Sequence, residues 1–176
     1  MFGLPLHPTL VHFPIVLAVL MPVVALAFWV AGRRFGAMRK FWSAVVILQV
    51  LLFGSAFLAV QSGGRDEERV EKVLVSESPL ESHEEKAEVF LWISGAAIPL
   101  AALGLAPGIL GLSGQALAGL ASLAILFAGF QAGHTGGQLV YQHGAAAAYV
   151  GDKTQGSVGQ ASQSESGRSK TDDDDD

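Results

Sequence analysis

Long stretches without charge constrain this chain more than any other feature. Residues 1–32, 41–64 and 89–151 contain no Asp, Glu, Lys or Arg. An uncharged apolar run of about 18 residues or more is typical of a membrane-spanning helix. Only 15% of all residues are charged and 51% are hydrophobic, whereas soluble domains carry about 25% charged residues. The sequence therefore predicts an integral membrane protein whose first partner is the lipid bilayer.

The three uncharged stretches predict four crossings, because the third stretch is too long for one helix. A crossing takes about 20 helical residues, and turn signals interrupt the third stretch at Pro107-Gly108 and at Gly111–Gly114. The expected fold class is all-α, a four-helix transmembrane bundle within residues 1–150. Its helices are expected at about residues 10–31, 41–61, 79–106 and 115–132.

Charged residues between the second and third helices predict a short extramembrane helical segment. Asp66–Leu74 has a helical composition, and Ser76–Pro79 interrupts it. Ser78 and Glu81 have the spacing of a capping box, with proline at the first helical position, which indicates where the third helix begins. Residues 151–176 are rich in Gly, Ser, Gln and Asp, a composition that predicts a disordered acidic tail.

Basic residues predict the orientation in the membrane. The segment after the first helix carries four of them and no acid: Arg33, Arg34, Arg39 and Lys40. This pattern favours a cytoplasmic loop, and with four crossings it places both termini outside. The first helix has no basic residue before its apolar core, so we expect an anchor and not a cleaved signal peptide.

Three tryptophans near helix ends are expected to be interfacial anchors: Trp29, Trp42 and Trp92.

Missing residue types exclude several functions. The chain has no cysteine, which excludes disulfides, thiolate catalysis, iron–sulfur clusters and Cys-ligated zinc. The expected spans lack the ionisable groups that proton pumps, voltage sensors and most ion-coupled transporters need. The sequence has no stripe of basic residues that would indicate a nucleic-acid partner. No nucleophile elbow, phosphate loop or paired buried acid is found, so we do not expect the chain to be an enzyme on its own.

Histidine remains as the residue type that could form a site. Four crossings bring all five to one face of the membrane: His7, His12, His83, His134 and His143. Histidines from different helices of a bundle commonly hold haem or a metal. His12 and His134 lie nearest the lipid boundary, and we expect them to be the axial pair of a haem b. His83 would pair with His7 or His143 in a second, more exposed site.

Two alternatives to haem stay open on these residues. In the first, His12 and His134 hold a zinc or copper ion. In the second, the imidazoles cap helices or bind water, and the chain is a cofactor-free scaffold or assembly subunit of a membrane complex. The small-residue pair Gly129 and Gly133 would then let helices approach closely.

Four motifs resemble a bacterial family. They are His7-Pro8 with Val11-His12-Phe13-Pro14, Ser62-Gly63-Gly64 with Glu67-Glu68, His83-Glu84, and Gly133-His134-Thr135-Gly136-Gly137-Gln138-Leu139-Val140-Tyr141-Gln142-His143-Gly144. Over residues 4–146 they resemble the predicted membrane proteins grouped as domain of unknown function 2231. The resemblance implies a four-helix domain of the bacterial inner (cytoplasmic) membrane, sometimes joined to c-type cytochromes or other redox-linked modules. With both termini periplasmic, we expect an electron-transfer subunit that works with membrane or periplasmic redox partners.

Overall fold

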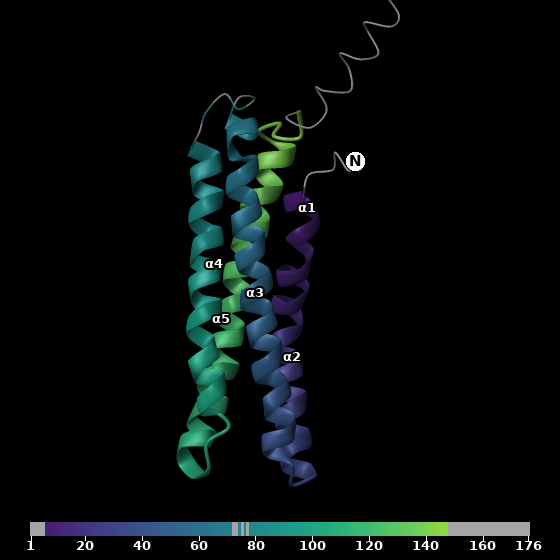
Figure 1. Cartoon of the computed structure of the whole chain (residues 1–176), viewed down its shortest axis with the longest axis vertical. Coiled ribbons are helices and arrows are strands. Elements are labelled where there is room, and N and C mark those ends of the chain that lie inside the picture. The colour runs from purple at the N-terminus through teal and green to yellow at the C-terminus, as the bar shows by residue number, and fades with distance from the viewer. Residues whose placement is uncertain (1–5, 72–73, 75, 77, 148–176) are drawn as a thin grey trace, which may run out of the picture.

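The computed structural model of this chain describes residues 6–71, 74, 76 and 78–147, whose regular elements are all helices (Figure 1). In chain order they are α1 (Leu6–Leu10), α2 (His12–Arg34), α3 (Met38–Glu71), α4 (Ser78–Leu103) and α5 (Gly108–Tyr141). Four helical stretches are long and apolar enough to cross a membrane: His7–Arg34, Met38–Arg65, Ser78–Leu103 and Gly108–Tyr141. The expected all-α four-helix fold is confirmed, and it is consistent with a multi-pass integral membrane protein. The expected disordered tail, residues 151–176, lies outside the described residues.

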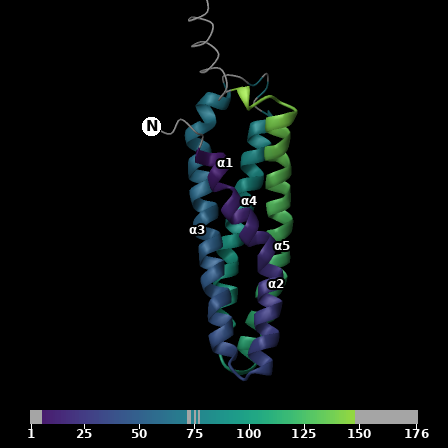
Figure 2. The ribbon, with the colours of Figure 1, turned by 90° about the vertical axis from the view of Figure 1, so that its right-hand side faces the viewer.

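The helices form an up-and-down bundle whose neighbours along the chain are also neighbours in space (Figures 1 and 2). Helix α2 packs against α5 as well as α3, which closes the ring and leaves α3 and α5 diagonally opposite. Helices α1 and α4 begin, and α3 and α5 end, at one end of the bundle. We call it the histidine end, because all five histidines lie at this end, on α1, at the starts of α2 and α4, and on and after the last turns of α5. The opposite end is the arginine end, which carries Arg33, Arg34, Arg39 and Lys40.

Buried positions on α3 and on α4 from Phe90 onward recur at spacings of three and four residues. On α3 they are Trp42, Val45, Gln49, Leu52, Ala56, Ala59 and Ser62, and on α4, after Leu80, they are Phe90, Ser94, Ala97 and Ala101. This spacing is that of helices packed nearly parallel in a left-handed bundle. Most inward residues are small, while large apolar side chains such as Val23 and Phe127 are each 66% exposed. The outer surface therefore has the apolar character that lipid requires.

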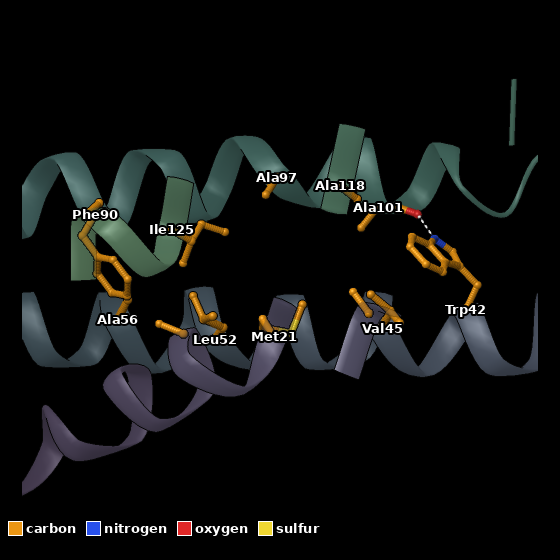
Figure 3. Close-up of a cluster of buried hydrophobic side chains, with 13 residues drawn as sticks. Met21, Trp42, Val45, Leu52, Ala56, Phe90, Ala97, Ala101, Ala118 and Ile125 are labelled. Carbon is orange, nitrogen blue, oxygen red and sulfur yellow. Dashed lines mark hydrogen bonds between the residues drawn. The ribbon is translucent and has the colours of Figure 1, made fainter. Parts of the chain in front are cut away.

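Buried polar side chains connect the helices through backbone carbonyls. The Gln49 amide on α3 donates to the Ser94 carbonyl over 2.9 Å, and the Gln115 amide on α5 donates to the Gly104 carbonyl over 2.8 Å. Trp42 is 1% exposed, and its indole N–H donates to the carbonyl of Ala101 over 2.9 Å (Figure 3). The expectation that Trp42 is an interfacial anchor is therefore wrong, because its ring is packed in the core against the backbone that follows α4.

The fourth crossing is longer than expected. Helix α5 begins at Gly108 and not near residue 115, because Gly111 and Gly114 lie inside the helix. A side chain on Gly111 would collide with the Ala106 carbonyl, so the glycines are needed for close packing and not for a turn. The turn before α5 runs from Gly104 to Pro107, beside the expected Pro107-Gly108 signal, and Gly108 has a φ of 66° that favours glycine.

The other helix boundaries also differ from the expected spans, and α4 ends at Leu103, before the expected residue 106. Helix α3 continues to Glu71, so part of the expected extramembrane helical segment is a continuation of the second crossing. The first crossing is interrupted at Val11, between α1 and α2. Pro14 has no N–H to offer the Leu10 carbonyl, which accounts for an interruption at this place. Helix α4 begins at Ser78, where the capping-box spacing predicted a start.

We predict that Gly104→Ala destabilises the bundle. The added methyl group would overlap the Trp42 indole, and overpacking of this kind costs about 1–3 kcal/mol. Gly54→Ala is the matched control, because nothing lies within 4 Å of a Cβ placed there and alanine favours a helix. Thermal unfolding in detergent should show a lower midpoint for Gly104→Ala only; equal midpoints would contradict the packing described here.

Candidate site at the histidine end

Two histidines from different helices face one another at the histidine end. His7 lies on α1 and His83 near the start of α4. Their ring centres are 6.4 Å apart, and the ring planes are inclined at 78°. Both side chains are partly buried. The sequence interpretation offered His7 or His143 as the partner of His83 in a second site, and the fold brings His83 to His7.

Helix α3 holds the His7 ring. The Nδ1 atom of His7 lies 2.9 Å from the Ala59 carbonyl oxygen and 3.1 Å from Oγ of Ser62. Because a carbonyl oxygen only accepts, Nδ1 must carry the proton and donate it. The Ser62 hydroxyl itself donates to the same carbonyl over 2.7 Å. In the neutral ring, this leaves the lone pair on Nε2.

Helix α5 holds the His83 ring by the same kind of contact. The Nδ1 atom of His83 lies 3.1 Å from Oγ1 of Thr135. The Thr135 hydroxyl has a single hydrogen, and it is directed to the carbonyls of Gln131 and Ala132 at 3.2 and 3.1 Å. Thr135 therefore accepts from His83, whose Nδ1 carries the proton. The neutral His83 ring then also has its lone pair on Nε2.

Two glycines make room for the two rings. A Cβ added to Gly63 would lie 3.2 Å from Cε1 of His7, and one added to Gly136 would lie 3.0 Å from Cε1 of His83. Either distance is tighter than ordinary packing of a side chain. The absence of a side chain at these two positions therefore lets each imidazole lie against a helix backbone.

The two halves of the site repeat one short motif. Helix α3 carries Ala59-Val60-Gln61-Ser62-Gly63-Gly64, and α5 carries Ala132-Gly133-His134-Thr135-Gly136-Gly137. Both read Ala-x-x-Ser/Thr-Gly-Gly, with the hydroxyl three residues and the first glycine four residues after the alanine. The hydroxyl bonds Nδ1 in each case, and the glycine faces the ring. The site is thus built twice, from α1 with α3 and from α4 with α5.

The arrangement is suited to binding a metal centre through two imidazoles. Ligating histidines commonly donate Nδ1–H to a carbonyl or hydroxyl, which fixes the ring and leaves Nε2 for the metal. His7 and His83 are fixed in this way by diagonally opposite helices. Among the described residues, no cluster of three or more His, Cys, Asp or Glu that could hold a metal ion is found. Any centre at this pair would therefore have two protein ligands from the described part of the chain.

The other three histidines lie elsewhere at this end. His12 on α2 is exposed. His134 is exposed and stacks on Phe130, with 6.1 Å between ring centres and an inclination of 12°. His143 follows α5 and is exposed. The expected axial pair, His12 with His134, stays a prediction; in the described part of the chain, the structure records ring contact between histidines only for His7 with His83.

The spacing of inward positions distinguishes His7 and His83 from the other histidines already in the sequence. On α4, His83 falls on the alternating series of residues 80, 83, 87, 90, 94, 97 and 101. His7 falls on the corresponding series 7, 11, 14, 18, 21 and 25, whereas His12 follows position 11 and lies off it. The repeated Ala-x-x-Ser/Thr-Gly-Gly motif was a second signal that the sequence interpretation missed.

Comparisons with family models, with curated proteins and with solved structures each give no match. The resemblance to domain of unknown function 2231 therefore stays a prediction that rests on its four motifs. Any function has to follow from the chemistry of the residues described above.

We predict that Thr135→Val weakens the His83 half of the site. Valine has the shape of threonine but cannot accept the Nδ1 hydrogen, and loss of one such bond costs about 1 kcal/mol. Thr9→Val, at an exposed position on α1, is the control. Thermal unfolding of cofactor-free protein in detergent should show a lower midpoint for Thr135→Val than for Thr9→Val. Identical midpoints would mean that the His83–Thr135 bond does not hold the helices.

Proposed function

We propose that this integral membrane protein binds haem b at the histidine end, with His7 and His83 as axial ligands, and serves as an electron-transfer subunit. The observation that carries the proposal is the 6.4 Å between the two ring centres. A metal ion about 2 Å from one nitrogen of each of two opposed imidazoles separates the ring centres by about 6 Å. The observed separation is close to this value, and His7 and His83 would be the residues that hold the iron.

The number of donors favours haem over zinc. Zinc sites take three or four protein ligands, and the described residues offer no cluster of that size. Haem brings four nitrogens of its own and takes one or two axial ligands from the protein. A pair of imidazoles with Nε2 available is the donor set that such a centre requires.

The contribution of the chain is to orient the two rings. Ala59 and Ser62 hold His7, and Thr135 holds His83, so neither ring can rotate without losing a hydrogen bond. Hydrogen bonds to Nδ1 also raise the basicity of Nε2 and strengthen it as a ligand. When bound, haem supplies a one-electron carrier whose potential depends on these axial ligands and their partners.

We further infer the membrane and the side. The basic residues of the arginine end favour the cytoplasm, which places the histidine end on the periplasmic side of a bacterial inner membrane. A carrier there would exchange electrons with other membrane or periplasmic redox subunits. The exposed histidines, His12, His134 and His143, lie on the same end, where a partner would dock.

We predict that the purified full chain, supplied with haemin in detergent, forms a near one-to-one complex. The oxidised protein should show a Soret band, and dithionite should sharpen the α and β bands, as two imidazole ligands require. His7→Ala and His83→Ala should each abolish the sharp reduced bands. His12→Ala and His134→Ala are matched controls, because their exposed rings lie outside the pair, and they should keep the full spectrum.

Two results would overturn this assignment. If His12→Ala and His134→Ala lost the bands while His7→Ala and His83→Ala kept them, the axial pair expected from sequence alone would be correct instead. If wild-type protein stayed colourless with haemin, haem would be excluded. Elemental analysis of that sample would then separate zinc or copper binding from a cofactor-free scaffold.

We also predict the orientation, which can be measured directly because the chain has no cysteine of its own. Ser76→Cys, near the histidine end, should react with a membrane-impermeant maleimide added to intact spheroplasts. Arg39→Cys, at the arginine end, should react only after lysis. The opposite labelling pattern would place the histidine end in the cytoplasm and contradict a periplasmic partner.

A further inference from the structure

A groove at the arginine end lies between α2 and α5, far from the histidine pair. It has a volume of about 740 Å³ and is lined by Trp29, Val30, Arg33, Arg34 and Leu112. It is a shallow depression open to the surroundings, so an occupant would lie against it and stay partly exposed. We propose that this groove binds an anionic phospholipid, with the phosphate at the two arginines and an acyl chain along the apolar wall.

The charge of this end selects an anion. The helix ends that meet here belong to residues 1–65 and 89–151, and these ranges contain no Asp or Glu. Arg33 and Arg34 are exposed, and the helix ends that meet here supply no carboxylate to neutralise them. Arginine binds phosphate through paired N–H groups and is more weakly hydrated than lysine, which suits it to a headgroup at a membrane surface.

The arginines are also positioned for a ligand in the groove. The guanidinium of Arg33 lies over the Trp29 ring, 5.2 Å from its centre, and this contact fixes the guanidinium beside the groove wall. Helix α5 begins at the same end, and its N-cap residue Pro107 offers no side-chain hydrogen bond to the first turn. The positive end of the α5 dipole therefore adds to the attraction for an anion.

The apolar wall selects a lipid and not a free phosphate ion. Val30 is 48% exposed and Leu112 is 41% exposed, so both offer apolar surface to an occupant. Along α2 the exposed apolar surface continues from Val30 through Leu26 and Val23. A phospholipid whose headgroup binds the arginines would therefore lay an acyl chain along this exposed apolar side of α2. Basic pockets of this kind on the cytoplasmic side of membrane helices bind anionic headgroups.

Native mass spectrometry of the full chain in detergent tests the proposal with equimolar phosphatidylglycerol and phosphatidylcholine. Wild type should retain phosphatidylglycerol preferentially. Arg33→Gln/Arg34→Gln should lower that retention about thirtyfold, from loss of two charges near the phosphate. The matched control is Arg39→Gln/Lys40→Gln, which removes the same charge from the same end without changing a residue that lines the groove, and it should keep the preference.

A third variant separates the groove from the charge. Leu112→Trp fills the apolar wall and leaves every arginine in place, so it should also lower retention of phosphatidylglycerol. It keeps the test decisive if the arginine variant does not fold. Inorganic phosphate in excess should leave retention unchanged, because it has no acyl chain to occupy the wall.

Three outcomes would overturn the proposal. Equal retention of the two lipids by wild type would show no selection for an anion. Equal losses in both double variants would assign binding to the overall charge of this end and not to the groove. Displacement by inorganic phosphate would identify a site for a bare anion.

Discussion

Close approach of the helix backbones is the constraint on which the rest of this structure depends. The inward stripes consist mainly of Ala, Gly and Ser, among them Ala18, Ala56, Ala97 and Gly129. Large side chains there would push the helices apart, and lipid offers no hydrophobic drive to bring them back. With small residues inside, the large apolar ones are left to face outward, the reverse of a water-soluble bundle. Backbone carbonyls then come within reach of side chains on neighbouring helices, as for Trp42, Gln49 and His7.

The same close approach explains why the histidine site takes the form it does. A helix carbonyl has a second lone pair, but the side chain four residues later normally covers it. At Ala59 that later residue is Gly63, and the imidazole of His7 lies in the space that a side chain would occupy. Gly136 stands in the same relation to Ala132 and leaves space for His83. The glycines are therefore part of the ligand arrangement and not merely helix-loosening residues.

The sequence alone could predict the features that depend on uncharged length, but not those that depend on close packing of the helices. The lengths of the stretches without charged residues determine the number of membrane crossings. The four-helix fold could therefore be predicted from the positions of the charged residues along the chain. Helix ends were predicted less well, because Gly111 and Gly114 have the composition of a turn but serve packing inside α5. The histidines could be assigned to one end by counting crossings. Their pairing was predicted less well, since distance from the lipid boundary was taken as the guide to the main pair, whereas the inward face of each helix decides which rings meet.

The two ends of the bundle differ in chemistry because the middle cannot hold charge. A charged side chain inside lipid is costly, so ionisable groups collect where the helices emerge. At the arginine end they stand on exposed helix termini. At the histidine end two imidazoles are drawn inward instead, which is possible because a neutral ring with its Nδ1 hydrogen bonded carries no charge to desolvate. A metal centre held by such rings would lie inside the bundle yet close to the water-exposed surface, where a redox partner can approach it.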